Sequence, residues 1–188
     1  MLANRLKILL AERDLSIKDL MKATGLSRNS LSNMVNNPFA NIATENVDKL
    51  CNYLEVAPKD FYDYSGWLFS FNFAEGGEKQ PSISITMKSG KMVRTIHLLL
   101  NFDYIDPADP NNNAEDEHEI IIASDPNGYD ESFATVYEEL SPLFKHQIES
   151  ELIKYAKKAL QIYNDKNTVP CVFNYYHKDE IIFEATLD

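Results

Sequence analysis

Cysteine is scarce in this sequence of 188 residues, and metal-binding spacings are absent. The two cysteines, Cys51 and Cys171, lie far apart and form no CxxC pair, so we expect both to be buried as small hydrophobic side chains. The four histidines fall in separate expected elements, without the short spacing of metal ligands: His97, His118, His146 and His177. The pattern predicts neither a metal site nor a cofactor.

Long hydrophobic runs are also missing. No apolar stretch approaches the roughly 20 residues that span a bilayer. The first 14 residues contain no hydrophobic region of the signal-peptide kind, because charged residues such as Arg5, Lys7 and Glu12 interrupt them. We therefore expect a soluble, cytoplasmic protein. Hydrophobic residues make up 44% of the chain, which is enough to build packed cores and argues against disorder.

Signatures of catalysis do not occur either. The phosphate-binding GxxxxGKS/T pattern, GxGxxG and GxSxG are absent, so nucleotide binding and serine hydrolysis have no support. The Ala-Gly and Cys-Gly dipeptides that self-cleaving repressors cut are absent as well. The loop at 106–113 offers oxygen ligands but lacks the central glycine and terminal glutamate of a calcium loop. We expect that the protein is not an enzyme.

Acidic charge, in contrast, is plentiful and confined to one part of the chain. Residues 1–64 carry eight basic and eight acidic residues, whereas residues 65–188 carry 10 basic and 21 acidic ones and hold the whole net charge of −11. A neutral domain can bind DNA when its cations share a face, because phosphate contacts are local. An acidic domain is repelled by the duplex, so we expect the second part to point away from DNA, dimerise or bind a protein.

Residues 16–37 form the most informative segment. Their pattern predicts a helix, a tight turn and a second helix, with five inward-facing side chains: Leu20, Ala23, Leu26, Leu31 and Met34. Gly25 lies where the chain must reverse, which usually requires a left-handed backbone that glycine adopts without strain. Ser27 is the expected N-cap of the second helix.

The second helix has an unusual outward face. All its outward positions are polar and none is acidic: Arg28, Asn29, Ser30, Ser32, Asn33, Asn36 and Asn37. A solvated helix normally mixes Glu and Lys, whereas amide, hydroxyl and guanidinium groups suit hydrogen bonds to base edges or phosphates. The alternative is a helical bundle without a DNA role. That alternative does not explain why a turn glycine, a serine N-cap and an amide-rich outward face occur together.

Together these features resemble the Cro/C1-type (XRE-type) helix-turn-helix domain of phage repressors and bacterial regulators. The resemblance covers residues 1–64. Leu6, Ile8, Leu9 and Leu10 resemble the first helix of the family, residues 44–54 its fourth, and residues 56–62 its short fifth. In the fourth helix we expect Thr44 as N-cap, with Val47, Leu50, Cys51 and Leu54 inward. Met21 departs from the family, which usually has a small alanine there.

The resemblance implies an all-α, five-helix domain whose helix at about 28–36 enters the major groove. Arg28, Asn29 and Asn33 occupy the positions that contact bases in this family. Further side chains are implied as phosphate contacts: Lys18, Ser27, Ser30, Asn36, Asn37 and Asn41. The implied function is a sequence-specific transcriptional regulator of double-stranded DNA, most simply a phage or mobile-element repressor that binds a palindromic operator as a homodimer.

Residues 65–188 predict an α+β domain, an antiparallel sheet with one long helix. Alternating residues predict strands at 67–73 and 82–88, with a hairpin turn at Ser89-Gly90 and a longer strand at 92–102. A surface loop is expected at 103–118, a short strand at 119–124, the long helix from 141 to about 164, and a closing hairpin at 169–185. We expect this domain to dimerise the protein or to bind a partner.

An alternative assigns a second activity to the acidic domain. Some phages fuse a helix-turn-helix domain to an inhibitor of a host defence nuclease, of the anti-CRISPR type, so that one protein autorepresses its promoter and blocks the enzyme. Carboxylates can occupy a basic nucleic-acid channel. The candidates are Glu115, Asp116, Glu117, Glu119, Glu138 and Glu139. An acidic surface that only maintains solubility is the simpler explanation, and a small-molecule sensor is a third possibility.

Overall fold

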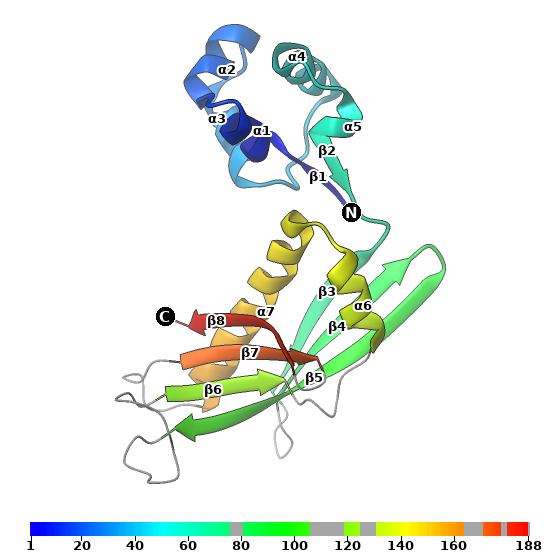
Figure 1. Ribbon diagram of the computed structural model, residues 1–188, viewed down its shortest axis with the longest axis vertical. Helices are drawn as coiled ribbons and strands as arrows, with labels where there is room; N and C mark the ends of the chain where they lie inside the picture. The colour runs from blue at the N-terminus through cyan, green and yellow to red at the C-terminus, as the bar shows by residue number, and fades with distance from the viewer. Residues whose placement is uncertain (76–80, 106–118, 125–130, 164–170, 178–179, 188) are drawn as a thin grey trace. The chain divides into compact units, whose positions relative to one another are not determined.

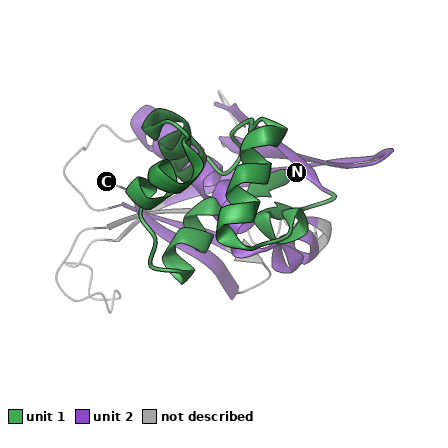
Figure 2. Cartoon of the chain, turned by 90° about the horizontal axis from the view of Figure 1, so that it is seen from above, with its two compact units in different colours: residues 1–66 green, residues 67–188 purple. Residues whose placement is uncertain are grey.

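The structure is a computed structural model that describes residues 1–75, 81–105, 119–124, 131–163, 171–177 and 180–187 (Figure 1). The chain separates into two compact units, Met1–Gly66 and Trp67–Asp188, which Figure 2 shows in different colours. The boundary expected from the sequence, after residue 64, lies two residues before the observed one. Among the helices of the described residues, none combines the length and apolar character needed to cross a membrane.

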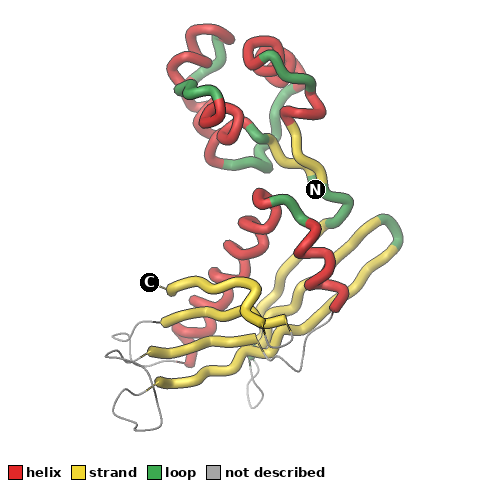
Figure 3. The backbone as a smooth tube through the Cα atoms, viewed as in Figure 1, coloured by secondary structure: helices red, strands yellow, loops and turns green. Residues whose placement is uncertain are grey.

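The first unit is mainly helical (Figure 3). Its helices are α1 (Leu6–Glu12), α2 (Ile17–Thr24), α3 (Arg28–Asn36), α4 (Thr44–Leu54) and α5 (Pro58–Phe61). Pro58 begins α5, where its missing N–H is not needed. The expectation for α4 was wrong by one residue. Ala43 is the N-cap, and its carbonyl accepts from the Asn46 and Val47 amides, so Thr44 is already helical and makes no capping bond.

Two short strands, which the sequence analysis did not predict, close the first unit. β1 (Leu2–Asn4) pairs antiparallel with β2 (Tyr62–Tyr64). Asn4 is buried, and its side chain accepts from the Leu6 amide at 3.1 Å and donates to the Pro38 carbonyl at 2.9 Å. These bonds tie the start of the unit to the loop that follows α3. Three-residue strands are too short to show an alternating pattern in sequence.

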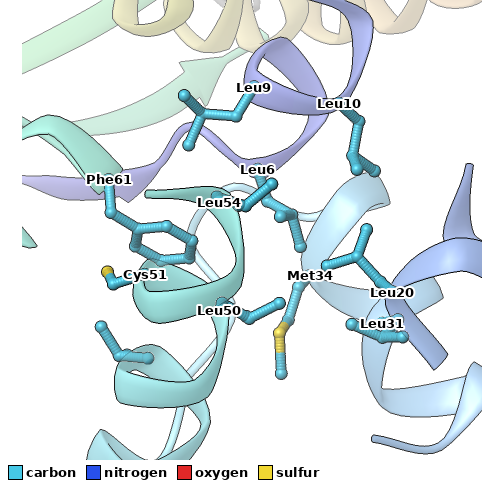
Figure 4. Packing of buried hydrophobic residues seen from close by; sticks show 11 residues of the cluster. Leu6, Leu9, Leu10, Leu20, Leu31, Met34, Leu50, Cys51, Leu54 and Phe61 are labelled. Atoms are coloured by element: carbon cyan, nitrogen blue, oxygen red, sulfur yellow. The ribbon is translucent and has the colours of Figure 1, made fainter. Parts of the chain in front are cut away.

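A hydrophobic core joins the helices of the first unit (Figure 4). Its buried members are Leu6, Leu9, Leu10, Leu20, Leu31, Met34, Val47, Leu50, Cys51, Leu54 and Phe61. Burial raises the pKa of the Cys51 thiol, and the nearby Asp48 carboxylate raises it further. Ala23 was expected in this core but is exposed. The inward stripe of α2 runs through Ile17, Leu20 and Thr24, and Ala23 lies on its flank.

The second unit is a six-stranded sheet with two helices. In chain order the elements are β3 (Leu68–Ala74), β4 (Ser82–Ser89), β5 (Met92–Ile105), β6 (Glu119–Ser124), α6 (Glu131–Glu139), α7 (Pro142–Tyr163), β7 (Cys171–His177) and β8 (Glu180–Leu187). The strands follow the order β3-β4-β5-β6-β7-β8 in the sheet. β5 continues to Ile105, so part of the loop expected at 103–118 is strand.

The prediction of a wholly antiparallel sheet with one helix was wrong in two respects. β6 and β7 pair in parallel, whereas the other neighbours pair antiparallel. Parallel neighbours need a crossover connection, and here the chain between them contains both α6 and α7. The helix α6 was not predicted because it is short and its apolar pattern, Phe133, Val136 and Tyr137, spans little more than one turn.

The two helices pack on one face of the sheet. Phe69 of β3 meets Phe133 of α6 edge to face at 6.4 Å, and Phe73 stacks on Tyr155 of α7 at 6.2 Å between ring centroids. The Tyr155 hydroxyl donates to the Phe71 carbonyl at 3.2 Å. The alternating aromatic residues of β3 therefore lie on the sheet face that the two helices cover.

The core of the first unit generates a stability prediction. Leu50→Ala removes a side chain with 0% exposure and should lower the free energy of unfolding by about 2–5 kcal/mol, because the helices cannot fully close the cavity. Ile8→Ala, at a side chain 38% exposed, is the control and should cost less than about 1 kcal/mol. Urea unfolding followed by far-ultraviolet circular dichroism measures both. Equal losses would contradict the assigned core.

Candidate nucleic-acid interface

The helix α2 begins with a reciprocal capping box. The Ser16 hydroxyl oxygen accepts from the Asp19 amide at 3.3 Å, and an Asp19 carboxylate oxygen accepts from the Ser16 amide at 2.9 Å. The same carboxylate oxygen accepts from the Ser16 hydroxyl at 2.5 Å. The hydrogen bonds from the Ser16 side chain and backbone lower the pKa of Asp19, so the carboxylate is engaged in the cap.

The turn between α2 and α3 depends on a left-handed residue. Gly25 has φ of +71° and its amide donates to the Met21 carbonyl at 3.1 Å, which ends α2. The Thr24 hydroxyl donates to the Leu20 carbonyl at 2.6 Å and accepts from the Leu26 amide at 3.3 Å. No atom lies within 4 Å of a Cβ placed at Gly25, so the demand for glycine comes from the backbone angle and not from crowding.

The next helix, α3, is held from its inner side and capped at its start. Ser27 has an extended backbone, and its hydroxyl oxygen accepts from the Ser30 amide at 3.2 Å, as predicted. Leu31 and Met34 are buried in the core of the unit. The helix ends before Pro38, whose ring disfavours helical backbone at Asn37.

The outward side of α3 carries the residues expected to contact bases. Arg28, Asn29 and Asn33 are all exposed. Asn29 and Asn33 lie one turn apart and share a face, and Arg28 occupies the first helical position. The structure therefore places these three side chains on the solvent side of a rigidly held helix, and their base contacts remain a prediction.

The residues expected to contact phosphates lie on α2, on α3 and its N-cap, and in the segment that follows α3. Lys18, Ser27, Asn36, Asn37 and Asn41 are exposed, whereas Ser30 is half-buried. The Asn37 side-chain oxygen accepts from the Phe39 amide at 3.1 Å, which leaves its amide N–H groups as donors. The Asn37 carbonyl accepts from Asn4 at 3.3 Å.

The local charge favours an anionic ligand. Residues 20–44 contain no Asp or Glu, although the unit as a whole is neutral. Lys18, Lys22 and Arg28 are exposed cations in and beside the motif. Lys22 was not among the expected contacts. Its position one turn after Lys18 on the same helix is the sequence signal that points to it.

The acidic residues considered for a partner lie in the second unit. Glu138 and Glu139 are exposed at the end of α6, and Glu119 begins β6. Glu115, Asp116 and Glu117 lie outside the described residues. Within the described ranges, no group of three or more His, Cys, Asp or Glu side chains is arranged to hold a metal ion.

Comparison with known proteins identifies the first unit. Residues 5–66 match the Cro/C1-type HTH DNA-binding domain. The N-terminal unit is a Cro/C1-type helix-turn-helix domain. The match covers about a third of the chain and confirms the resemblance seen in the sequence. No match to the chain was found among the curated proteins or among the solved structures.

The capping box of the helix-turn-helix domain predicts a pH effect. Because the pKa of Asp19 is lower in the folded protein than its unfolded value of about 3.9, the ionised group stabilises the fold above that value. This contribution is lost as the pH falls from about 4 through the folded pKa. Asp19→Asn should therefore lose less stability than the parent between about pH 5 and pH 3.

Urea unfolding at the two pH values, followed by circular dichroism, provides the measurement. Asp48→Asn is a matched control, because this exposed carboxylate forms no hydrogen bond or ion pair within the described chain. An acid-induced loss in Asp19→Asn as large as in the parent would show that the cap does not depend on charge.

Proposed function

We propose that the protein is a sequence-specific DNA-binding transcriptional regulator. The observation that carries the proposal is the outward side of α3 in the Cro/C1-type domain, which exposes Arg28, Asn29 and Asn33 in a segment without carboxylates. An α-helix fits the major groove of B-DNA, and a carboxylate on its outer face would be repelled by the phosphates. We propose no catalytic activity.

Each side chain on this face has a matching base edge. The Arg28 guanidinium can donate two parallel hydrogen bonds to guanine O6 and N7. The amides of Asn29 and Asn33 can donate to adenine N7 and accept from its N6 amino group. Because Leu31 and Met34 hold the opposite side of α3 in the core, the base-reading groups are presented with little loss of conformational freedom.

Phosphate contacts would fix the register of the helix in the groove. Lys18 and Lys22 supply charge from α2, and the exposed amides of Asn36, Asn37 and Asn41 supply donors near the end of α3. The Ser27 hydroxyl accepts a hydrogen bond in the cap, and its own proton stays available for a phosphate oxygen. Such contacts position the protein but do not distinguish sequences.

The proposed regulator binds a palindromic operator as a homodimer, in the manner of a phage or mobile-element repressor. One recognition helix contacts few base pairs, so two copies on two half-sites give the affinity that regulation requires. The second unit is the proposed dimerisation element. Of the carboxylates that a nuclease inhibitor would use, Glu138 and Glu139 have described side chains, and both are exposed.

Substitution of the base-reading residues tests the proposal. Arg28→Ala or Asn33→Ala should weaken binding to the preferred duplex by about 1–3 kcal/mol while leaving the fold intact, because both side chains are exposed. The duplex is first selected from a random pool by the intact protein, and affinities are then titrated at fixed salt. Lys49→Ala and Asn52→Ala, at exposed positions of α4, are matched controls. Equal losses on selected and random DNA would refute the base-reading roles.

Removal of the second unit tests the dimer. A chain ending at Gly66 should keep its sequence preference but bind the full operator more weakly than the intact protein, because the two half-sites are no longer linked. Sedimentation should show a dimer for the intact protein and a monomer for the short chain. If the short chain binds the full operator as tightly as the intact protein, dimerisation through the second unit is wrong.

A further inference from the structure

Charge is segregated within the acidic second unit. Residues 79–102 contain four basic residues and no Asp or Glu, whereas the rest of the unit contains six basic and 21 acidic residues. The described part of this segment comprises β4 and the first eleven residues of β5. An unbroken stretch without carboxylates in a unit of charge −11 marks a surface that can approach an anion.

Three of these four basic residues, Lys88, Lys91 and Arg94, lie at the end of the β4–β5 hairpin, in a segment we call the hairpin tip (residues 88–94). Ser89 pairs with Met92, Lys88 with Val93 and Met87 with Arg94, and Gly90 turns the chain with φ of +57°. β3 begins its pairing at Lys88, so no third strand flanks the turn. The turn extends beyond β3 on one side, and on the other side β6 pairs with β5 only from Leu100 onward (Figure 1).

The hairpin tip is exposed on both sides of the ribbon. Lys88 and residues 90–95 are all exposed, including Met92 at 49% and Val93 at 58%. Lys88 and Arg94 lie on opposite sides, because they occupy adjacent rows of the strand pair. The tip therefore presents cations on both sides and at the turn, where Lys91 lies.

These cations have no carboxylate partner among the described residues. Within this part of the chain, Lys88, Lys91 and Arg94 form no ion pair, whereas Lys154 of α7 pairs with Glu151 at 3.0 Å and Lys158 with Glu75 at 3.9 Å. The hairpin tip thus keeps its full positive charge available for a ligand.

The sheet surface behind the tip is polar and lacks carboxylates. α6 and α7 cover the opposite face, and the uncovered face of β3–β5 carries the cross-strand rows Ser70–Thr86–Thr95 and Asn72–Ser84–His97. The Thr86 and Thr95 hydroxyls are hydrogen-bonded at 2.9 Å, and the Ser84 hydroxyl lies 2.9 Å from His97 Nδ1. Hydroxyl, amide and imidazole groups tolerate a nearby phosphate, which a carboxylate would repel.

We propose that the hairpin tip binds the phosphate backbone of duplex DNA, in addition to the contact proposed for α3. A two-stranded ribbon fits the major groove, where it has a phosphate strand on either side, and this matches cations on both sides of the tip. The proposal rests on the proposed function, since it takes the same duplex as its ligand.

Two other partners fit the tip less well. Single-stranded nucleic acid is usually bound by aromatic side chains on which bases stack, and neither the tip nor the two cross-strand rows behind it carry an aromatic ring apart from the His97 imidazole. Pairing of two tips from two copies would bring together six positive charges. Lysine is also depleted at the centres of protein interfaces, whereas it is common at phosphate contacts.

A triple variant with a matched control tests the hairpin tip. Lys88→Ser/Lys91→Ser/Arg94→Ser removes three cations from the tip, and Lys154→Ser/Lys157→Ser/Lys158→Ser removes three from α7 of the same unit. Binding of the full chain to the selected duplex is measured by fluorescence anisotropy over a salt series. The tip variant should bind about tenfold more weakly near 0.1 M salt, and its salt slope should fall by up to about 2.7, or about 0.9 for each lost phosphate contact.

The outcomes separate this proposal from the proposed function. The α7 variant should keep the salt slope of the parent because its tip is unchanged. It has the same net charge as the tip variant, so a difference in slope between the two variants cannot come from net charge. Equal slopes in the parent and tip variant would overturn the proposal, and an accompanying loss of sedimentation mass would assign the tip to self-association instead. If the parent binds no duplex, the proposed function fails and the tip contact fails with it.

Discussion

The orientation of α3 depends on one backbone angle and one patch of core. Gly25 turns the chain with a left-handed conformation, and Leu20 and Leu31 are then buried together in the core of the helix-turn-helix domain. A residue with a side chain at this angle would strain the turn even though no atom crowds it. The face that carries Arg28, Asn29 and Asn33 is exposed because the opposite side of the same helix is held.

The second unit uses its two sheet faces differently. Aromatic rings from β3 pack against α6 and α7, and the Tyr155 hydroxyl bonds to the carbonyl of Phe71, so this face and the neighbouring backbone are covered. On the other face, β3–β5 expose polar rows without carboxylates. The net charge of −11 therefore conceals a surface of opposite sign at residues 88–94. The expectation that the second unit is repelled by DNA stays a prediction, and it concerns the acidic part of the unit.

The expectations that failed share a physical cause. Ala23 has a helical spacing that permits burial, but the position of the stripe on α2 depends on what the helix packs against. The N-cap of α4 is the residue whose carbonyl accepts the first hydrogen bond of the helix. The sequence allows either Ala43 or Thr44 in this role. The pairing of β6 with β7 is decided by the path of the chain through α6 and α7, which no local pattern in the strands encodes.

The sequence by itself determined the helix-turn-helix domain, because a turn glycine, a serine cap and an apolar stripe act within a few residues of one another. It also determined the outward residues of α3, since helical periodicity separates them from Leu31 and Met34. Only the tertiary structure decided that Asn4 is buried against the loop after α3, and that Lys88, Lys91 and Arg94 project from both sides and the turn of an exposed ribbon. Such features arise from contacts between distant segments, and burial and strand register follow from packing that a single sequence does not display.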